Sequence, residues 1–231
     1  MKKIVKLILS SLIFFFFLSV FVLVIFRFVN PAGSSFINLK SYQFPEKFFS
    51  ADAEYKWKPI EEISDNIKLS VIASEDQKFF DHFGFDVEQI QKAIEERDKR
   101  IRGASTITQQ VAKNLFLWGG QNFIRKGLEA YFTLMIELVW DKKRILEVYL
   151  NIAQFGNDVY GAEAAAQHFY NKNSANLNNY EAAVLAAVLP NPEKYSAKNL
   201  SRYIIYRRNN VLKQMRYLGG EKFIEENLQS D

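Results

Sequence analysis

The 231-residue sequence predicts an all-α fold in which a helical domain follows a single N-terminal transmembrane helix. Two observations support this prediction. Apolar residues recur at helical spacing in one segment after another, while neither an alternating strand pattern of useful length nor a repeat period is present. Residues 7–26 form an uncharged apolar run interrupted only by serines, and a helix of that length spans roughly 30 Å, the thickness of a bilayer core.

The apolar run is interpreted as an uncleaved anchor. A signal peptide usually has an apolar region of only about 7–15 residues, and no A-x-A cleavage site follows closely here. Lys2, Lys3 and Lys6 precede the run and only Arg27 follows it, which predicts a cytoplasmic N-terminus and a domain on the outer side of the membrane. The predicted divisions are a cytoplasmic tail (1–6), a transmembrane anchor (7–29), an aromatic-rich linker (30–58) and a globular domain (59–231).

The charge balance separates the anchor from the domain. Residues 1–30 carry four basic and no acidic side chains, which leaves 26 basic and 26 acidic residues in the rest of the chain. The pI near 9.0 therefore gives no reason to expect a nucleic-acid partner. The absence of cysteine excludes disulfides and thiolate metal sites, and the only histidines, His82 and His168, lack metal-ligand spacing and are expected to be structural.

The aromatic residues of the linker allow two interpretations. They either lie at the headgroup level of the membrane, where such rings are favoured, or pack on the domain as a collar, which we favour slightly. The basic C-terminal helix likewise either faces anionic headgroups or presents a solvated face. Its cations are Arg202, Arg207, Arg208, Lys213 and Arg216.

The helices of the domain are predicted from their start and stop signals. Asn178 and Glu181 form a capping box, Pro190 ends the helix that they open, and Gly219-Gly220 stops the last helix. Predicted helices begin at Ser64, Asp86, Asn122, Asp141 and Asn178, and others cover residues 105–117, 162–169 and 199–218.

The helix predicted over residues 105–117 is the central element of the sequence. Ser105 is expected to cap it, and its polar face carries hydroxyls, amides and Lys113. Exposed N–H groups, a positive dipole end and a lysine two turns on suit a phosphate ligand. The alternative is an ordinary amphipathic helix with a good cap, and the local physics favours neither interpretation.

Two carboxylates are candidates for proton transfer. Glu75 ends an apolar stripe and precedes several aromatic residues, although a solvated acidic pair with Asp76 is the alternative. Glu129 follows the basic pair Arg125-Lys126 by one turn, so it could equally form an i,i+4 salt bridge and nothing more.

Five short motifs occur in order over about residues 70–196, and together they closely resemble the bacterial peptidoglycan glycosyltransferases (glycosyltransferase family 51). Nothing after them leaves room for a penicillin-binding transpeptidase domain, so the monofunctional form is expected. The motifs are Glu75-Asp-Gln-Lys-Phe-Phe-Asp-His82-Phe-Gly84, Arg102-Gly-Ala-Ser-Thr-Ile-Thr-Gln-Gln110 with Lys113-Asn-Leu-Phe116, Arg125-Lys-x-x-Glu129, Ile145-Leu-Glu-Val-Tyr-Leu-Asn151 and Leu189-Pro-Asn-Pro-Glu-Lys-Tyr195.

The resemblance implies a lysozyme-like helical fold of two lobes with a membrane-facing cleft. It implies polymerisation of lipid II into β-1,4-linked glycan, with inversion and release of undecaprenyl pyrophosphate. Glu75 matches the general base, and Glu129 matches the second acidic position, which positions the donor or assists the leaving group. The family's pyrophosphate- and sugar-binding positions correspond to Ser105, Thr106, Gln110, Lys113, Asn114, Arg125, Lys126 and Lys194.

The resemblance also implies the partners: lipid II, the growing glycan strand, membrane lipid and other cell-wall synthases. No metal ligand or cofactor is required by this interpretation, although a divalent Mg²⁺ or Mn²⁺ ion stays open. Relatives commonly carry a basic residue where this chain has Gln121, so either Arg102 or Arg125 supplies that charge or leaving-group binding is weaker.

Two other classes stay open. A lytic transglycosylase or muramidase would use Glu75 as an acid to cut glycan, but it does not need the basic pyrophosphate set. A non-catalytic cell-wall scaffold would tolerate loss of Glu75 or Glu129, and both are present.

Overall fold

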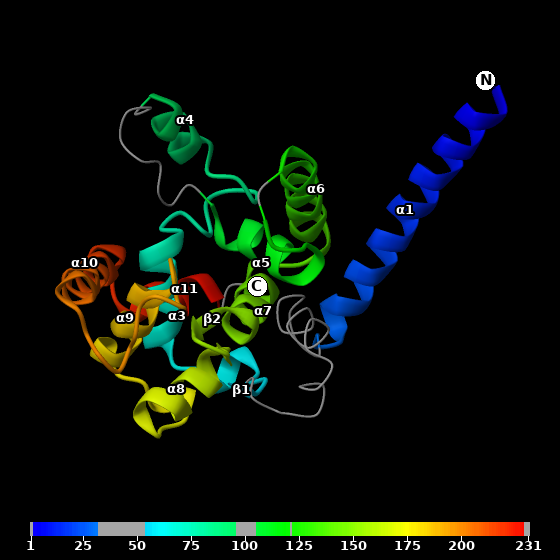
Figure 1. The fold of residues 1–231 in the computed structure, drawn as a ribbon. Helices are drawn as coiled ribbons and strands as arrows, with labels where there is room; N and C mark the ends of the chain where they lie inside the picture. The colour runs from blue at the N-terminus through cyan, green and yellow to red at the C-terminus, as the bar shows by residue number, and fades with distance from the viewer. Residues whose placement is uncertain (1, 32–53, 96–104, 121, 229–231) are drawn as a thin grey trace.

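The computed structural model describes residues 2–31, 54–95, 105–120 and 122–228. Helix α1 (Lys2–Phe28) projects from a helical domain, which only its C-terminal half contacts (Figure 1). It is long and apolar enough to cross a membrane, as the sequence predicts. Gln121, Arg102 and the linker aromatics before Tyr55 lie outside the described residues.

The described part of the domain consists of two groups of helices, with α4 extending away from both (Figure 1). In the first group, α9 packs against α3 and α10, and α11 packs against α3. In the second, α5 packs against both α6 and α7. The helices are α3 (Asp65–Glu75), α4 (Val87–Glu95), α5 (Ile107–Phe116), α6 (Phe123–Val139), α7 (Lys142–Ile152), α8 (Ala162–Tyr170), α9 (Asn179–Val188), α10 (Arg202–Leu218) and α11 (Glu221–Leu228), with short 3₁₀ turns η2 (Ile60–Glu62) and η3 (Ser174–Asn176).

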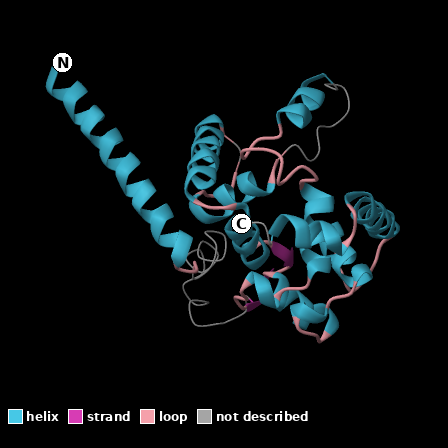
Figure 2. Ribbon diagram, turned by 180° about the vertical axis from the view of Figure 1, so that it is seen from behind, coloured by secondary structure: helices cyan, strands magenta, loops and turns pink. Residues whose placement is uncertain are grey.

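A small sheet was missed by the sequence prediction. Its strands are β1 (Glu54–Tyr55), β2 (Gln154–Gly156) and β3 (Val159–Tyr160), in the order β1-β3-β2 (magenta in Figure 2). β3 pairs with β1 in parallel and with β2 antiparallel. Segments of two or three residues are too short to show the alternation by which strands are recognised.

The tight turn after this sheet requires glycine. Gly161 has φ +86°, and a Cβ atom there would lie 2.6 Å from the backbone oxygen of Asn151. Both its backbone angle and the close approach of α7 therefore exclude a side chain.

Most of the predicted helix starts are confirmed. The side chains of Asp86, Asn122, Asp141 and Asn178 accept hydrogen bonds from backbone N–H groups three residues on. Ser105 is not the cap of the central helix, because Thr106 holds that position in a capping box with Gln109. The last basic helix begins after Ser201 rather than at residue 199.

Small residues in α9 allow the first group of helices to pack closely. The residues from 182 to 188 of α9 are buried, and four of them are alanine. Ser70 on α3 donates a hydrogen bond to the carbonyl of Ala182 at 3.1 Å, and the Ser74 hydroxyl, whose one proton also faces Glu75, lies 3.3 Å from the carbonyl oxygen of Ala186. These contacts fix the end of α3, and therefore Glu75, relative to α9.

A buried carboxylate connects α3 to the start of α5. Asp76 Oδ2 accepts a hydrogen bond from the backbone N–H of Ile107 at 2.9 Å, and its Oδ1 lies 2.8 Å from Nε2 of His82. The expected structural role of His82 is consistent with this contact. Because Asp76 directly follows Glu75, this contact sets the position of α5 relative to the candidate base.

Candidate active site

Glu75 lies at the C-terminal end of α3 and faces a cavity of about 590 Å³. The cavity lies between the two groups of helices, since residues from α3, α5 and α10 line it. The loop after α9 completes its wall and brings Lys194 and Tyr195 to the rim. Glu75 is thus a cleft residue, and the alternative of a solvated pair with Asp76 is wrong because Asp76 is buried.

Three side chains hold the Glu75 carboxylate in place. Ser74 Oγ donates to Oε1 at 3.0 Å, and Gln110 Nε2 donates to Oε2 at 3.0 Å. The guanidinium of Arg207, on α10, approaches Oε1 to 3.9 Å and donates to Ser74 Oγ at 3.2 Å. Each carboxylate oxygen therefore has a fixed donor, and the group is oriented toward the cavity.

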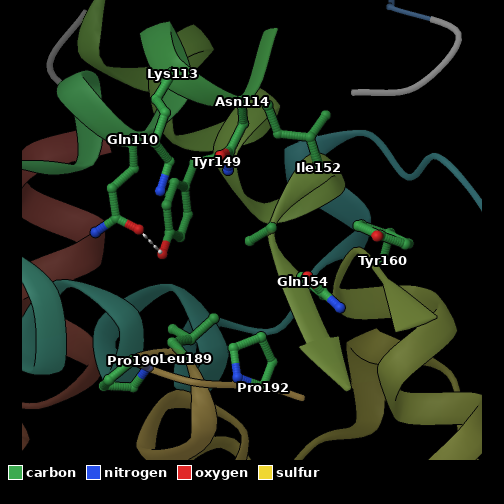
Figure 3. A pocket seen from close by; sticks show the side chains of 11 residues that line it. Gln110, Lys113, Asn114, Tyr149, Ile152, Gln154, Tyr160, Leu189, Pro190 and Pro192 are labelled. Carbon is green, nitrogen blue, oxygen red and sulfur yellow. Dashed lines mark hydrogen bonds between the residues drawn. The ribbon is translucent and has the colours of Figure 1, made fainter. Parts of the chain in front are cut away.

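Tyr149 orients the amide of Gln110. Its hydroxyl donates to Gln110 Oε1 at 3.3 Å (Figure 3). Nε2 of the same amide is therefore the atom that donates to Glu75. Burial raises the pKa of Tyr149 well above its ordinary value, so the phenol keeps its proton and stays a donor. The close-up also shows Lys113 and Asn114 beside this pair, at a smaller cavity of about 200 Å³.

A second large cavity, of about 770 Å³, collects the basic residues. Lys113, Arg125 and Lys126 line it together with Glu129. It shares Ser105, Gln110 and Lys113 with the cavity of Glu75, so the two are adjacent parts of one cleft. Lys113 lies where they meet.

Glu129 is engaged by both of its basic neighbours. Arg125 Nη1 donates to Oε2 at 3.1 Å and Lys126 Nζ to Oε1 at 2.5 Å, while the residue is only 3% exposed. The i,i+4 salt bridge considered from the sequence is therefore present. It lines a cavity rather than a solvated surface, and Arg125 Nε is buried with no acceptor among the described residues. Arg125 and Lys126 therefore line the cavity as an ion-paired cluster with Glu129, next to any anion that enters it.

Burial lowers the pKa of Lys113, an effect that the nearby Glu129 carboxylate opposes and the Arg125 guanidinium reinforces. The lowered pKa therefore reflects the cost of burying the ammonium group, which the nearby carboxylates of Glu129 and Glu75 offset only in part. An anionic ligand in this cavity would stabilise the charged form of Lys113 further.

The remaining predicted residues take different places. Ser105 is exposed and lines both large cavities. Thr106 is buried, and its hydroxyl donates to Gly84 O at 2.7 Å and accepts from Gln109 N, so it positions α5 instead of facing the cleft. Lys194 is exposed at the rim of the Glu75 cavity.

Three residues around Glu75 were missed as site residues. Ser74 directly precedes the first motif and Tyr149 lies within the fourth, so their positions in the sequence indicate a place near the site. Arg207 was assigned to the lipid-facing or solvated side of the last helix, and that assignment is wrong because its guanidinium points into the cleft. In the described parts of the chain, no three His, Asp or Glu side chains come together as a metal site.

Comparison with known proteins places the chain among enzymes of one kind. The family model described as "Transglycosylase" matches residues 44–216. A biosynthetic peptidoglycan transglycosylase of Pseudomonas syringae pv. syringae is 46% identical over 230 residues, which cover 97% of this chain and 96% of that protein. Proteins of the same name from Shewanella oneidensis and Haemophilus influenzae are 49% and 50% identical, covering 88% and 92% of this chain and 88% of each relative.

Proposed function

This chain belongs to the transglycosylase family and is a peptidoglycan glycosyltransferase, and on that premise we propose that Glu75 is its general base. The proposed pyrophosphate site consists of Lys113, Arg125 and Lys126. The substrate is lipid II and the product a β-1,4-linked glycan strand. One observation carries the assignment of roles: the cavity of Glu75 and the cavity of the three cations meet at Gln110 and Lys113.

The proposed reaction is a single displacement. Glu75 accepts the proton of the acceptor sugar's 4-hydroxyl while that oxygen bonds to the anomeric carbon of the donor. The bond from the anomeric carbon to the pyrophosphate oxygen breaks, and its electron pair leaves with the lipid pyrophosphate. Because an α-linked donor becomes a β-linked product, one base suffices and no covalent nucleophile is needed.

The leaving group acquires negative charge, and the basic cavity supplies fixed positive charge for it. Lys113 is the proposed direct contact, and Arg125 and Lys126, which both also pair with Glu129, supply further positive charge at the same cavity. We assign Glu129 the role of holding these cations in position, since both of its oxygens accept hydrogen bonds from them.

We propose that Lys113, Arg125 and Lys126 supply the positive charge at the leaving group without a resident cofactor. Whether Mg²⁺ or Mn²⁺ accompanies the pyrophosphate of the substrate is a separate question. Polymerisation measured with EDTA and with each ion added back tests it.

The enzyme acts at the membrane in which its substrates are anchored. The basic N-terminal tail supports a cytoplasmic N-terminus and an active site on the outer face. α1 contacts α6 from Phe15 onward, so a bilayer that covers residues 7–26 also reaches α6. Apolar residues exposed on α6, namely Phe123, Ile124, Leu134 and Leu138, support immersion of this helix in the outer leaflet.

The test is polymerisation of labelled lipid II by the full-length protein and by Glu75→Gln. The amide keeps the size of the side chain but cannot take the proton, so the rate should fall by roughly 10²–10⁴-fold with folding intact. Glu62→Gln, which changes an exposed carboxylate paired with Lys58, should leave the rate unchanged. A folded Glu75→Gln protein that polymerised at the parental rate would transfer the assignment to Glu129, whereas cleavage of finished glycan would indicate a lytic enzyme.

A further inference from the structure

The last turn of α1 is bound by a side chain of the catalytic domain. The final carbonyls of a helix lack partners within it and need donors from elsewhere. Arg144, on α7, donates from Nε and Nη2 to the carbonyl of Phe26, at 3.1 and 2.8 Å, and from Nη2 to the carbonyl of Val29 at 3.0 Å. A guanidinium at this position also complements the negative end of the helix dipole.

The other donors of Arg144 are also used. Nη1 donates to Asn30 Oδ1 and to Glu147 Oε2, each at 2.9 Å, and the guanidinium lies 5.3 Å from the centre of the Trp57 ring. Arg144 is 7% exposed. Its planar fork therefore joins the end of the anchor to α7 in a fixed geometry that a lysine cannot reproduce.

Reciprocal contacts continue along the same interface. Arg27, from the last turn of α1, donates to the carbonyl of Val139 at the end of α6, and Trp140 Nε1 donates to the carbonyl of Leu23 at 2.8 Å. One turn deeper, Ser19 Oγ and the Tyr131 hydroxyl are 2.6 Å apart. Polar contacts at three levels, with Ser19 and Leu23 buried, describe a docked helix rather than a flexible tether.

We propose that Arg144 is a positioning residue that locks the membrane anchor to the catalytic domain and so holds the cleft at the bilayer surface. The inference rests on the proposed function, because it matters only if the substrates are membrane-bound. Arg144 touches none of the cavities of the active site, so its effect is on where the cleft lies and not on the chemical step.

The experiment compares Arg144→Ala with the parent in two media: lipid II embedded in liposomes and lipid II dissolved in detergent. Loss of the fork should reduce the liposome rate at least roughly tenfold, since even one hydrogen bond from a charged donor accounts for a factor of that order and Arg144 makes several. The detergent rate should change by no more than about twofold. Lys143→Ala removes a neighbouring cation of α7 that pairs with the exposed Glu61, and it should change neither rate. If Arg144→Ala does not fold, Arg144→Lys keeps the charge beside Glu147 and should show the same dependence on medium.

A chemical cross-link between α1 and α6 tests whether the loss of activity in Arg144→Ala comes from undocking of the anchor. The chain has no cysteine, so Ser19→Cys and Tyr131→Cys can be joined selectively by a short reducible bis-methanethiosulfonate. Cross-linking should recover the liposome rate of Arg144→Ala, and reduction should abolish the recovery. Equal losses in both media, or an unchanged liposome rate, would overturn the proposal. A parent protein inactive in both media would instead contradict the proposed function.

Discussion

Lys113 lies where the two large cavities meet, and burial lowers its pKa. The protonated form is the one that can bind pyrophosphate. As the pH rises, Lys113 should lose its proton, and kcat/KM for lipid II should fall, at a lower pH than for an ordinary lysine of pKa about 10.4. The pH profile of kcat/KM measures this limb.

Lys113→Arg is the matched variant, because a guanidinium stays charged to a pH above 12. Its alkaline limb should move to higher pH even if its rate is lower, since the planar fork differs from a point charge. An alkaline limb that is identical in both proteins would mean that another group titrates there.

The charge on Lys113 also has a consequence for stability. Where the folded pKa lies below the unfolded pKa, the unfolded chain binds more protons between the two values, and stability rises with pH across that interval. Lys113→Met should therefore abolish activity while unfolding at the same temperature as the parent or higher, as measured by thermal denaturation. A large loss of stability would show that the ammonium group supports the fold.

Arg207 faces Glu75 from α10, which packs beside α3 in the same group of helices, and its guanidinium is partly exposed to the cleft. Arg207→Ala removes the donor to Ser74 and the charge near the base, so kcat should fall about tenfold, equivalent to roughly 1.4 kcal/mol of transition-state stabilisation. The neighbouring Arg208 stacks on Tyr180 instead, and Arg208→Ala should keep the parental kcat. Equal effects of the two substitutions would argue for a general role of the basic helix.

At the scale of the element, the start of α5 is held from two sides. Its own cap, Thr106, is bonded to Gly84, and its first backbone N–H is bonded to Asp76. Gly84 adopts φ +77° and leaves no space for a Cβ, which would lie 2.8 Å from the Thr133 side chain. The loop between α3 and α4 therefore fixes the helix that carries Gln110 and Lys113.

Asp76→Ala tests this arrangement. It leaves the buried N–H of Ile107 without its acceptor, which should destabilise the fold by about 1–3 kcal/mol. For a domain of this size each kcal/mol lowers the melting temperature by about 2–4 °C. Activity should fall below the parental rate even at temperatures where the variant is fully folded, because Gln110 and Lys113 move relative to Glu75. Full activity in the folded variant would show that the contact serves stability alone.

The sequence predicted most helix starts because a cap depends on residues three positions apart. It placed the cap of α5 at Ser105 because adjacent Ser105 and Thr106 give nearly the same local signal. The choice between them depends on Gly84 and Asp76, which are distant in the sequence. The last helix begins after Ser201, because the Ser201 hydroxyl accepts a hydrogen bond from the backbone N–H of Ile204 and so caps the helix two residues later than predicted.

At the scale of the whole molecule, the site combines local motifs with contacts that only the fold provides. The motifs supplied Glu75, Gln110, Lys113 and the Arg125–Glu129 cluster, and the structure brings these residues to one cleft. Arg207 could not be assigned, because its contact with Ser74 spans 133 residues and periodicity does not report such a separation. The docking of α1 on α6 and α7 could not be predicted from the sequence for the same reason, because its contacts also join residues more than 100 positions apart.

The docking of α1 sets the orientation of the domain at the membrane, and the exposed apolar face of α6 is predicted to contact lipid. Phe123 is 97% exposed and Ile124 76% exposed, at the N-terminal end of a helix that lies beside the anchor (Figure 1). Burying a side chain such as phenylalanine in an apolar phase contributes about 1.5–3 kcal/mol. Placing a carboxylate there should therefore weaken contact with lipid without disturbing the core.

Ile124→Glu should accordingly lower the rate on lipid II in liposomes by at least roughly tenfold, while the rate in detergent stays near the parental value, because Ile124, unlike Phe123, does not line the basic cavity. The matched control is Tyr217→Glu, at a 71% exposed aromatic residue of α10, across the domain from the anchor. Because α10 lies far from α1 in both views, its substitution should leave both rates unchanged (Figures 1 and 2). If Tyr217→Glu reduced the liposome rate and Ile124→Glu did not, the membrane-facing side would be the basic helix, and the cleft would approach lipid from the opposite direction.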